Sequence, residues 1–306
     1  MKAVITGGLG FVGRHLAAHL DDEGVEPIAL DRIGDDPLDI TDATDVRERF
    51  DAIRPEIVYH LAALSHVGES WDAPAMTLRV NAEGTLNVLL AAHAAGVRRV
   101  VVVGSSDEYG AVLPDELPVS EATRLRPNTP YAASKAAAEI IAQQHTRGGG
   151  VETVCVRAFN HTGPGQPDRF VIPAFATRIA RAERDDADHI LVGNLASERD
   201  FSDVRDVVRA YALAAARGAA GSVYNVCSGR ARSMREIVEL LIAESGRPLK
   251  LVDDPALMRP VDTPRIVGDA SRLREATGWE PRIPLEETLR DVLADARASV
   301  AIGPRG

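Results

Sequence analysis

The sequence has little cysteine, and it has no apolar run long enough to cross a membrane. Its two cysteines, Cys155 and Cys227, stand in strand-like apolar runs, a setting typical of buried thiols and not of disulfides or metal ligands. No apolar segment approaches the roughly 20 residues that span a bilayer, and the chain enters a strand-like run at Lys2 without the parts of a signal peptide. We therefore expect a cytoplasmic protein without a disulfide or a metal site.

An excess of positive charge is also missing. The formal net charge of −10 argues against nucleic acid or an anionic membrane surface as the main partner. It leaves room for a phosphorylated small molecule held by a few arginines. With 306 residues, of which 45% are apolar and 26% charged, the chain is long enough for two packed domains.

Short apolar runs alternate with helical segments through the first half of the chain. Strands that are apolar throughout have both faces covered, and repeated β-α-β units with right-handed crossovers give a doubly wound parallel sheet. We therefore expect an α/β protein built on such a sheet. The expected strands are Ala3–Thr6, Pro27–Leu30, Ile57–Leu61, Arg99–Val103, Thr153–Val156 and Val223–Val226, and the expected helices include Arg14–Leu20, Ala82–Ala95 and Ala132–His145.

The second half has a different character. Glycine and proline are frequent after Asn160, and helical patterns return at Ala174–Arg184, Asp203–Arg217, Met234–Glu244 and Leu285–Ala298. This mixture predicts a smaller mixed α/β lobe that binds the substrate. We assign residues 1–158 to a dinucleotide-binding domain, completed by 203–227, and residues 159–306 mainly to the lobe.

A glycine-rich turn follows the first expected strand. Gly7, Gly10 and Gly13 are spaced G-x-x-G-x-x-G and precede an amphipathic segment. A strand that turns sharply into a helix leaves unpaired N–H groups and the positive end of the helix dipole facing the turn, which suits a pyrophosphate. A Cβ atom there would hold the phosphates away. Glycine clusters also mark ordinary tight turns, so the rest of the chain has to decide between the two interpretations.

Acidic residues follow the second expected strand. The carboxylate of Asp31 can accept hydrogen bonds from both ribose hydroxyls and repels a 2′-phosphate, which favours NAD, whereas the adjacent Arg32 suits the 2′-phosphate of NADP. Asp39, followed by Ile40, is placed either to bond the adenine amino group or to cap a helix in D-I-T-D. The residues leave both choices open.

Four polar residues predict an acid/base site. Ser105 and Ser106 stand at the carboxyl end of an expected strand, where the ligands of open α/β sheets bind. Tyr131 and Lys135 are four residues apart on an expected helix and therefore share a face. A lysine ammonium beside a tyrosine hydroxyl favours the phenolate, so we expect Lys135 to lower the pKa of Tyr131. Together with the glycine turn, this set indicates proton transfer beside a dinucleotide.

Several stretches of the chain occur together in a known pattern. They are TGGLGFVG, HLAA at His60–Ala63, N-x-E-G-T-x-N at Asn81–Asn87, Ser105, and Tyr131-Ala-Ala-Ser-Lys135. The combination resembles the extended short-chain dehydrogenase/reductase family, whose dinucleotide-binding fold is the Rossmann fold. The resemblance implies a redox step on a nucleotide-diphospho-sugar, with Tyr131 as acid/base, Lys135 on the nicotinamide ribose and Ser105 on the reacting sugar oxygen. It also implies a site for NAD or NADP built from Gly7, Gly10, Phe11, Val12, Gly13, Asp31, Arg32, Asp39, Ile40, Leu61, Ala62, Ala63 and Lys135.

The second half narrows this resemblance. RAFNHTGPGQ at Arg157–Gln166, the segment Gly193–Val208, and VYNVCSG at Val223–Gly229 are similar to the GDP-mannose branch of the family. That branch contains GDP-mannose 4,6-dehydratases and GDP-4-keto-6-deoxymannose reductases. A GDP-sugar is therefore the implied substrate.

Three residues fall where members of that branch hold the nucleotide and its diphosphate: Asn160, Arg199 and Arg259. The planar fork of arginine matches the geometry of phosphate. Ser106 is a further candidate for contact with the substrate. The alternative for Arg199 is an ion pair with Asp200 or Asp203, and Arg259 has an equally ordinary surface interpretation.

Asp107 bears on the reaction and is counted with the catalytic candidates. Similar dehydratases carry a glutamate two residues after the strand-end hydroxyl, as the base for the C5 proton, and this chain has the shorter Asp107 there. Elimination depends on placement at the ångström level, so we expect a reductase of the 4-keto group of GDP-4-keto-6-deoxymannose. The alternatives are a GDP-mannose 4,6-dehydratase, with Glu108 in that place, a nucleotide-sugar 4-epimerase, and a non-catalytic NAD(P)-sensing scaffold. The resemblance also implies a homodimer through Ala82–Ala95 and Ala132–His145.

Overall fold

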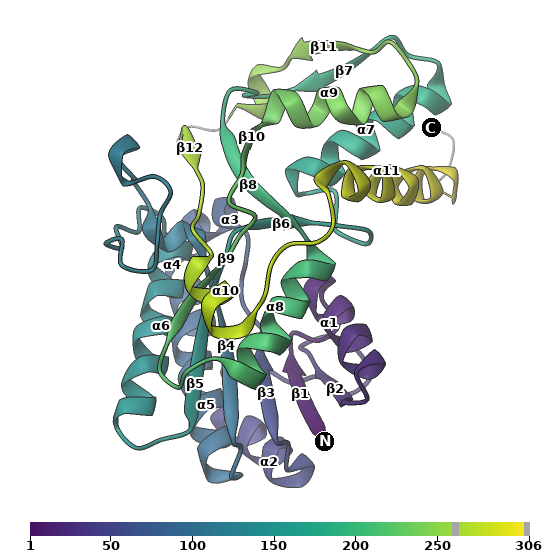
Figure 1. The fold of residues 1–306 in the computed structure, drawn as a ribbon. Coiled ribbons are helices and arrows are strands. Elements are labelled where there is room, and N and C mark those ends of the chain that lie inside the picture. Colours follow the sequence, from purple (N-terminus) through teal and green to yellow (C-terminus); the bar gives the residue numbers. More distant parts are fainter. Residues whose placement is uncertain (259–262, 303–306) are drawn as a thin grey trace.

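Within residues 1–258 and 263–302, the part of the chain that this computed structural model describes, a parallel sheet of six strands forms the centre of the larger domain (Figure 1). Each neighbouring pair is parallel, and in register Thr6 lies opposite His60 and Ser105 opposite Ala158. The prediction of a doubly wound parallel sheet is confirmed. In spatial order the strands are β2 (Glu26–Leu30), β1 (Lys2–Thr6), β3 (Ile57–His60), β4 (Arg99–Ser105), β5 (Glu152–Ala158) and β9 (Val223–Val226).

Helices cover both faces of this sheet. Alternate residues of β1 point to opposite sides, so Ala3 and Ile5 pack in the cluster with α1 and α8, while Val4 packs in the cluster with α2 and α5. This two-sided burial is the reason that the strands are apolar throughout. The covering helices are α1 (Phe11–Asp22) and α8 (Val204–Arg217) on one face, and α2 (Ala43–Ile53), α5 (Gly84–Ala94) and α6 (Pro130–Arg147) on the other.

Helix α6 begins where its sequence predicts. Pro130 occupies the first turn, and the hydroxyl of Thr129 accepts a hydrogen bond from the backbone N–H of Ala132 at 3.0 Å, so both N-terminal signals are present. The helix ends at Arg147, and Gly148 is its C-cap. This start places Tyr131 and Lys135 in the first two turns, above the ends of the strands.

The smaller lobe lies at the top of Figure 1 and packs α7, α9 and α11 around an apolar cluster of its own. The chain crosses between the two parts repeatedly: β8 leads directly into α8, and α10 returns to pack against α8 and β9. The elements of the lobe and the returning segment are β6 (Asn160–Thr162), α7 (Val171–Asp185), β7 (His189–Val192), β8 (Glu198–Asp203), β10 (Ala231–Ser233), α9 (Met234–Ser245), β11 (Lys250–Asp253), β12 (Arg265–Ile266), α10 (Ser271–Thr277) and α11 (Leu285–Ile302).

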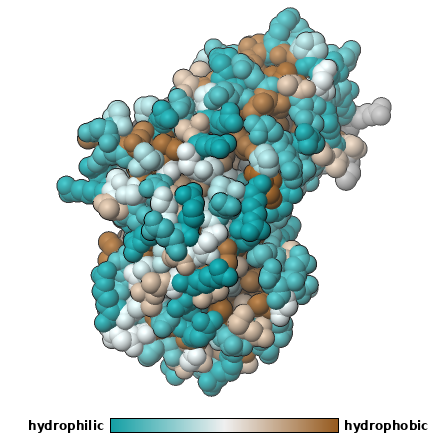
Figure 2. Space-filling view, viewed as in Figure 1, coloured by the Kyte–Doolittle hydropathy of each residue, from teal (hydrophilic) through white to brown (hydrophobic). Residues whose placement is uncertain are grey.

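Short elements that the sequence does not predict shape the loops above the sheet. They include α3 (Val67–Asp72), α4 (Pro74–Leu78), a π-helical turn at Arg79–Glu83, and the 3-10 turns η2 (Ser106–Tyr109), η3 (Pro114–Glu116) and η4 (Pro255–Leu257). Both cysteines are buried free thiols, as predicted. Among the residues described, none of the helices combines the length and apolarity of a membrane span. Figure 2 shows a mainly hydrophilic face with apolar side chains in small patches.

Candidate active site

A cavity of about 1650 Å³ lies between the carboxyl ends of the large sheet and the smaller lobe. Its wall contains every predicted site residue that falls within the described part of the chain. Arg259 lies outside the described residues. The predicted residues on the wall are Gly7, Gly10, Phe11, Val12, Gly13, Asp31, Arg32, Asp39, Ile40, Leu61, Ala62, Ala63, Ser105, Ser106, Asp107, Tyr131, Lys135, Asn160 and Arg199.

The three glycines of the first turn serve different purposes. Gly7 has a φ of +72°, and a Cβ there would lie 2.8 Å from the backbone nitrogen of Ala62. A Cβ at Gly13 would lie 2.7 Å from two backbone atoms of Gly8 and would overlap the carbonyl oxygen of Gly7. A Cβ at Gly10 would meet only that oxygen, at 3.2 Å. The argument that a side chain would hold phosphates away therefore applies to Gly10, while Gly7 and Gly13 are required by the protein's own backbone.

The start of helix α1 fits a pyrophosphate. Its N-cap, Gly10, offers no side-chain hydrogen bond to the first turn, so the N–H groups of that turn keep their donor capacity. Phe11, Val12 and Gly13 all line the cavity. Backbone donors and the positive end of the helix dipole thus face the space where a dinucleotide is expected.

Two acidic residues mark the far end of this cofactor region. The carboxylate of Asp31 accepts a hydrogen bond from the backbone N–H of Leu9 at 3.1 Å. Asp39 accepts hydrogen bonds from the N–H and the hydroxyl of Thr41, both at 2.8 Å, which lower its pKa. The cap of helix α2 is Asp42, so the helix-cap interpretation of Asp39 is wrong.

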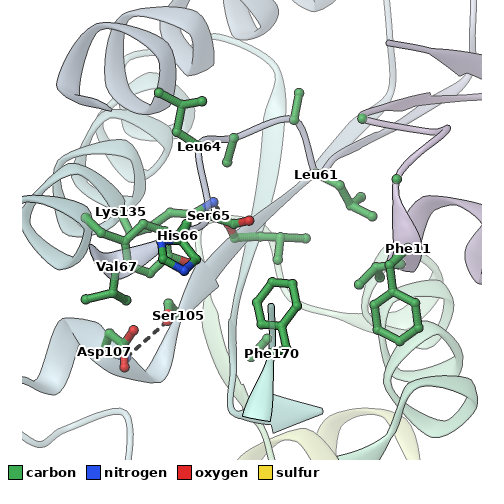
Figure 3. A pocket seen from close by; sticks show the side chains of 18 of the residues that line it. Phe11, Leu61, Leu64, Ser65, His66, Val67, Ser105, Asp107, Lys135 and Phe170 are labelled. Atoms are coloured by element: carbon green, nitrogen blue, oxygen red, sulfur yellow. Dashed lines mark hydrogen bonds between the residues drawn. The ribbon is translucent and has the colours of Figure 1, made fainter. Parts of the chain in front are cut away.

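The catalytic candidates meet on one wall of the cavity. Ser105 ends strand β4, and the Tyr131 hydroxyl on α6 lies close enough to the Ser105 side chain for that side chain to lower the tyrosine pKa. The Lys135 ammonium donates a hydrogen bond to the carbonyl oxygen of Val103 at 2.7 Å. Figure 3 shows Ser105, Asp107 and Lys135 on one side of the cavity and Phe11 on the other.

Asn81 connects this wall to the loop after β3. Its side-chain oxygen accepts from the N–H of Leu64 at 2.8 Å, and its amide nitrogen donates to the hydroxyl of Ser134 at 2.9 Å. Ser134 in turn donates to the carbonyl oxygen of Tyr131 at 2.7 Å. The side chain therefore fixes the start of α6 relative to the loop.

The pKa of Tyr131 moves in the opposite direction from the one expected. Burial raises it, the charge of Asp107 raises it further, and the hydrogen bond with Ser105 opposes both effects. Desolvation of the phenolate is the largest of these effects. Burial also lowers the pKa of Lys135 to about 8, against the influence of Glu108.

The two consecutive acids of η2 have different environments. Asp107 lines the cavity, and its backbone N–H donates to the Ser105 hydroxyl at 3.1 Å (Figure 3). Glu108 is fully buried, and its Oε1 accepts from the backbone N–H of Ser105 at 2.8 Å. The alternative that places Glu108 against the substrate is therefore wrong, and Asp107 is the acid beside the hydroxyl.

The smaller lobe forms the opposite side of the cavity. Arg199 of β8 lines it, as does Asn160 at the start of β6. Asp203 pairs with Arg205 at 2.7 Å, and Asp200 accepts hydrogen bonds from Ser228. The two acids suggested as ion-pair partners of Arg199 thus each have a partner of their own.

The sequence reasoning missed several side chains that line the same cavity. Arg79 stands two residues before the Asn81 motif, a position that could have drawn attention to it. The others are brought to the cavity by tertiary folding of loops and helices, which no local pattern reveals. The missed residues include His66, Arg79, Asn128, Arg169 and Tyr211.

Comparison with known proteins identifies the family. A family model described as GDP-mannose 4,6 dehydratase matches residues 36–292. The chain belongs to this family. It is also 39% identical to the GDP-6-deoxy-D-mannose reductase of Pseudomonas aeruginosa, over 98% of each chain.

Solved structures agree with this GDP-mannose 4,6 dehydratase family membership. The structure of RMD from Pseudomonas aeruginosa complexed with NADPH has a TM-score of 0.90 and 38% identity, covering 97% of this chain and 99% of that one. The Thermus thermophilus UDP-glucose 4-epimerase in complex with NAD has a TM-score of 0.87 and 28% identity, covering 98% and 100%. The predictions of an extended short-chain dehydrogenase/reductase, of an oxidoreductase and of a nicotinamide dinucleotide cofactor are confirmed.

Proposed function

We propose that the protein reduces the 4-keto group of GDP-4-keto-6-deoxymannose with a reduced nicotinamide dinucleotide. The observation that carries this proposal is the wall of Ser105, Asp107, Tyr131 and Lys135, which offers hydroxyl donors, a cation and the short carboxylate of Asp107. No glutamate lines the cavity among the described residues. A reduction needs only a proton donor and a place for the hydride, whereas a dehydration also needs a base for C5. The relative from Pseudomonas, a reductase by name, supports the same choice.

The larger domain, residues 1–158 completed by 203–227, is the part we propose for the dinucleotide. Gly10 and the first turn of α1 would hold the pyrophosphate, and Asp31 the adenosine ribose. Arg32 and Arg79 both lower the pKa of Asp39 by their positive charge. We therefore propose that these two cations are available to a 2′-phosphate on the adenosine ribose. Both NADH and NADPH therefore belong in the assay.

The reaction uses the protonated form of Tyr131. When bound, the cofactor supplies the hydride that reaches C4 of the sugar. The raised pKa of Tyr131 keeps its hydroxyl protonated at neutral pH. Tyr131 gives this proton to the sugar oxygen, and Ser105 holds the same oxygen by a hydrogen bond. The ammonium of Lys135 stabilises the phenolate that is left until solvent returns a proton.

The substrate's nucleotide end is proposed to lie against the smaller lobe. Asn160 and Arg199 on that side offer an amide and a guanidinium, and Ser106, which is buried at the cavity wall, is a further contact. Arginine suits a buried diphosphate because its donors are charged and planar. The role of Arg259 stays a prediction.

Two assays separate the reductase from the dehydratase. The purified protein is given GDP-4-keto-6-deoxymannose with NADPH or NADH, and oxidation of the nicotinamide is followed by absorbance. A second sample receives GDP-mannose without added cofactor and is examined for a 4-keto product. Oxidation in the first assay with no product in the second is expected. The reverse result would replace the reductase by a GDP-mannose 4,6-dehydratase, and cofactor binding without turnover in either would favour an NAD(P)-sensing scaffold.

A homodimer through α5 and α6 is also proposed. Leu90 on α5 is 51% exposed and Ile140 on α6 is 62% exposed, and these helices pack against each other. Large apolar side chains at such exposure support contact with a second copy of the chain. A cytoplasmic location stays a prediction.

A further inference from the structure

Lys135 of the catalytic wall is buried together with three ionisable side chains that do not line the cavity. Glu108 is 0% exposed, Lys135 7%, Glu139 4% and Arg157 4%. Charged groups are seldom buried to this extent unless they are paired. The two negative charges of the glutamates equal the two positive charges of the lysine and the arginine, so the cluster has no net charge when every member is ionised.

Within this cluster, Arg157 contacts Glu139 more closely than it contacts Glu108. Arg157 forks onto Glu139, with its Nε donating to Oε2 at 2.8 Å and its Nη2 donating to Oε1 at 2.7 Å. A third nitrogen of Arg157 donates to the Tyr109 hydroxyl at 3.0 Å. The distance from its Nε to Oε2 of Glu108 is 3.7 Å, too long for a hydrogen bond. Arg157 thus hydrogen-bonds to Glu139 and makes only an ion pair with Glu108, whose Oε2 has no hydrogen-bond partner among the described residues.

Glu108 is nevertheless held in one place. Its Oε1 accepts from the backbone N–H of Ser105, and a Cβ at Gly104 would overlap this oxygen. The glycine therefore leaves the space that the carboxylate occupies. Among the described residues, the side-chain hydrogen bond of Lys135 goes to the carbonyl of Val103, which is neutral. Of the two carboxylates in the cluster, Glu139 takes the hydrogen bonds of Arg157, and Glu108 is the one whose charge favours the ammonium of Lys135.

We propose that Glu108 is a positioning residue: it is the counter-charge that keeps Lys135 an ammonium, and it holds Ser105 by its backbone. The inference rests on the proposed function for the use of Lys135 and Ser105. The groups that face Glu108 are Tyr131, Lys135 and Glu139 on α6, and Cys155 and Arg157 on β5. Burial and Glu139 raise the pKa of Glu108 to about 8, while the hydrogen bond from the Ser105 backbone, then Arg157 and then Lys135 lower it, as expected for groups that titrate together.

The chain allows the charge of Lys135 to be observed directly, because Lys2, Lys135 and Lys250 are its only lysines. The protein without added cofactor is prepared with 13C at lysine Cε, and each signal is followed against pH by NMR. In Glu108→Gln, loss of the counter-charge should lower the pKa of Lys135 by about one unit or more. Lys2 and Lys250 serve as internal references. Glu152→Gln, which removes the partner of Arg99 at the far end of the sheet, is the matched control and should leave Lys135 unchanged.

A second variant separates charge from geometry. Glu108→Asp keeps the carboxylate but is one methylene shorter, so the Lys135 titration should stay nearer to wild type than in Glu108→Gln. An unchanged Lys135 titration in Glu108→Gln would overturn the proposal, and so would equal shifts in both variants. Because this readout needs no substrate, absence of turnover in the wild-type protein would refute the proposed function and leave this result standing.

The pH dependence of turnover gives a second readout. An ammonium is lost as the pH rises through its pKa, so removal of the counter-charge moves the alkaline loss of activity to lower pH. Glu108→Gln should approach wild-type turnover near pH 6 and fall about eightfold behind it near pH 8.5, which is what a shift of about one unit from a pKa of about 8 gives. A loss that is uniform across pH would show that Glu108 only supports the loop.

Discussion

Alanine at Gly10 and alanine at Gly13 should separate cofactor binding from folding. Gly10 has a φ of −70° and a ψ of 175°, which alanine adopts without strain, and its Cβ would touch only one oxygen, at 3.2 Å. We expect Gly10→Ala to fold with nearly unchanged stability. Its methyl group would project into the cavity where the pyrophosphate is expected. A misplaced methyl in a binding site costs about 1–3 kcal/mol, or roughly 10–200-fold in affinity.

Gly13→Ala should have the opposite effect. Its Cβ would press on backbone atoms of Gly7 and Gly8, which can yield only if the helix moves away from the strand. Overpacking of this kind costs about 1–3 kcal/mol or more, and the better helix propensity of alanine returns about 1 kcal/mol. Because the contacts are with backbone atoms, the upper end of the overpacking range applies, and we expect a net loss of stability of about 2 kcal/mol. It would be seen as a lower urea midpoint with an unchanged slope.

The assay combines urea unfolding without ligand and titration with NADPH for wild type and both variants. Gly24→Ala, where no atom lies within 4 Å of a new Cβ, has a φ of +74° and controls for backbone strain far from the cavity. The reasoning is refuted by a Gly10→Ala protein that binds NADPH as tightly as wild type. It is equally refuted by a Gly13→Ala protein of wild-type stability.

Three further outcomes are expected. Tyr131→Phe should lower turnover of the keto sugar by about 10²–10⁴-fold and leave NADPH binding nearly intact, so a fully active variant would contradict the proton-donor role. Burial lowers the pKa of His60 to about 3; the unfolded chain therefore takes up a proton first as the pH falls below about 6.5, and stability should drop by about 1.4 kcal/mol per pH unit. Urea unfolding at pH 7 and pH 5.5 measures this slope, which should be shallower in His60→Gln. Ile140→Arg should yield monomers in sedimentation velocity if α5 and α6 form the dimer, and a dimer that persists would exclude that face.

The larger domain could be predicted because its signals are local. Each central strand is apolar along its whole length, and the turn glycines and Tyr131 with Lys135 lie at short, recognisable spacings. The strands of the lobe carry no such signal. Strand β8 (Glu198–Asp203) is mainly polar, yet Asp200 within it is fully buried. Its carboxylate is satisfied by the backbone N–H groups of Gly229 and Gly268, which are distant in the sequence.

The burial of individual charged side chains could not be predicted from the sequence either, because it depends on contacts between distant segments. Asp107 and Glu108 are adjacent acids, and only the path of the η2 turn sends one to the cavity and the other beneath the sheet end. The pKa of Tyr131 depends on its burial and on the charge of Asp107. Spacing in the sequence shows which groups are close, while the sign of a pKa shift depends on how much water remains around them.

The repeated crossing of the chain between the two parts limits how this enzyme can be re-engineered. Strand β9 and helix α8 complete the large sheet and its cover, yet both follow the first segments of the lobe in sequence, and α10 returns still later. A chimera that exchanged everything after residue 158 as one block would therefore replace part of the larger domain together with the lobe. A change of substrate specificity has to be grafted in separate pieces, with α8, β9 and α10 left native.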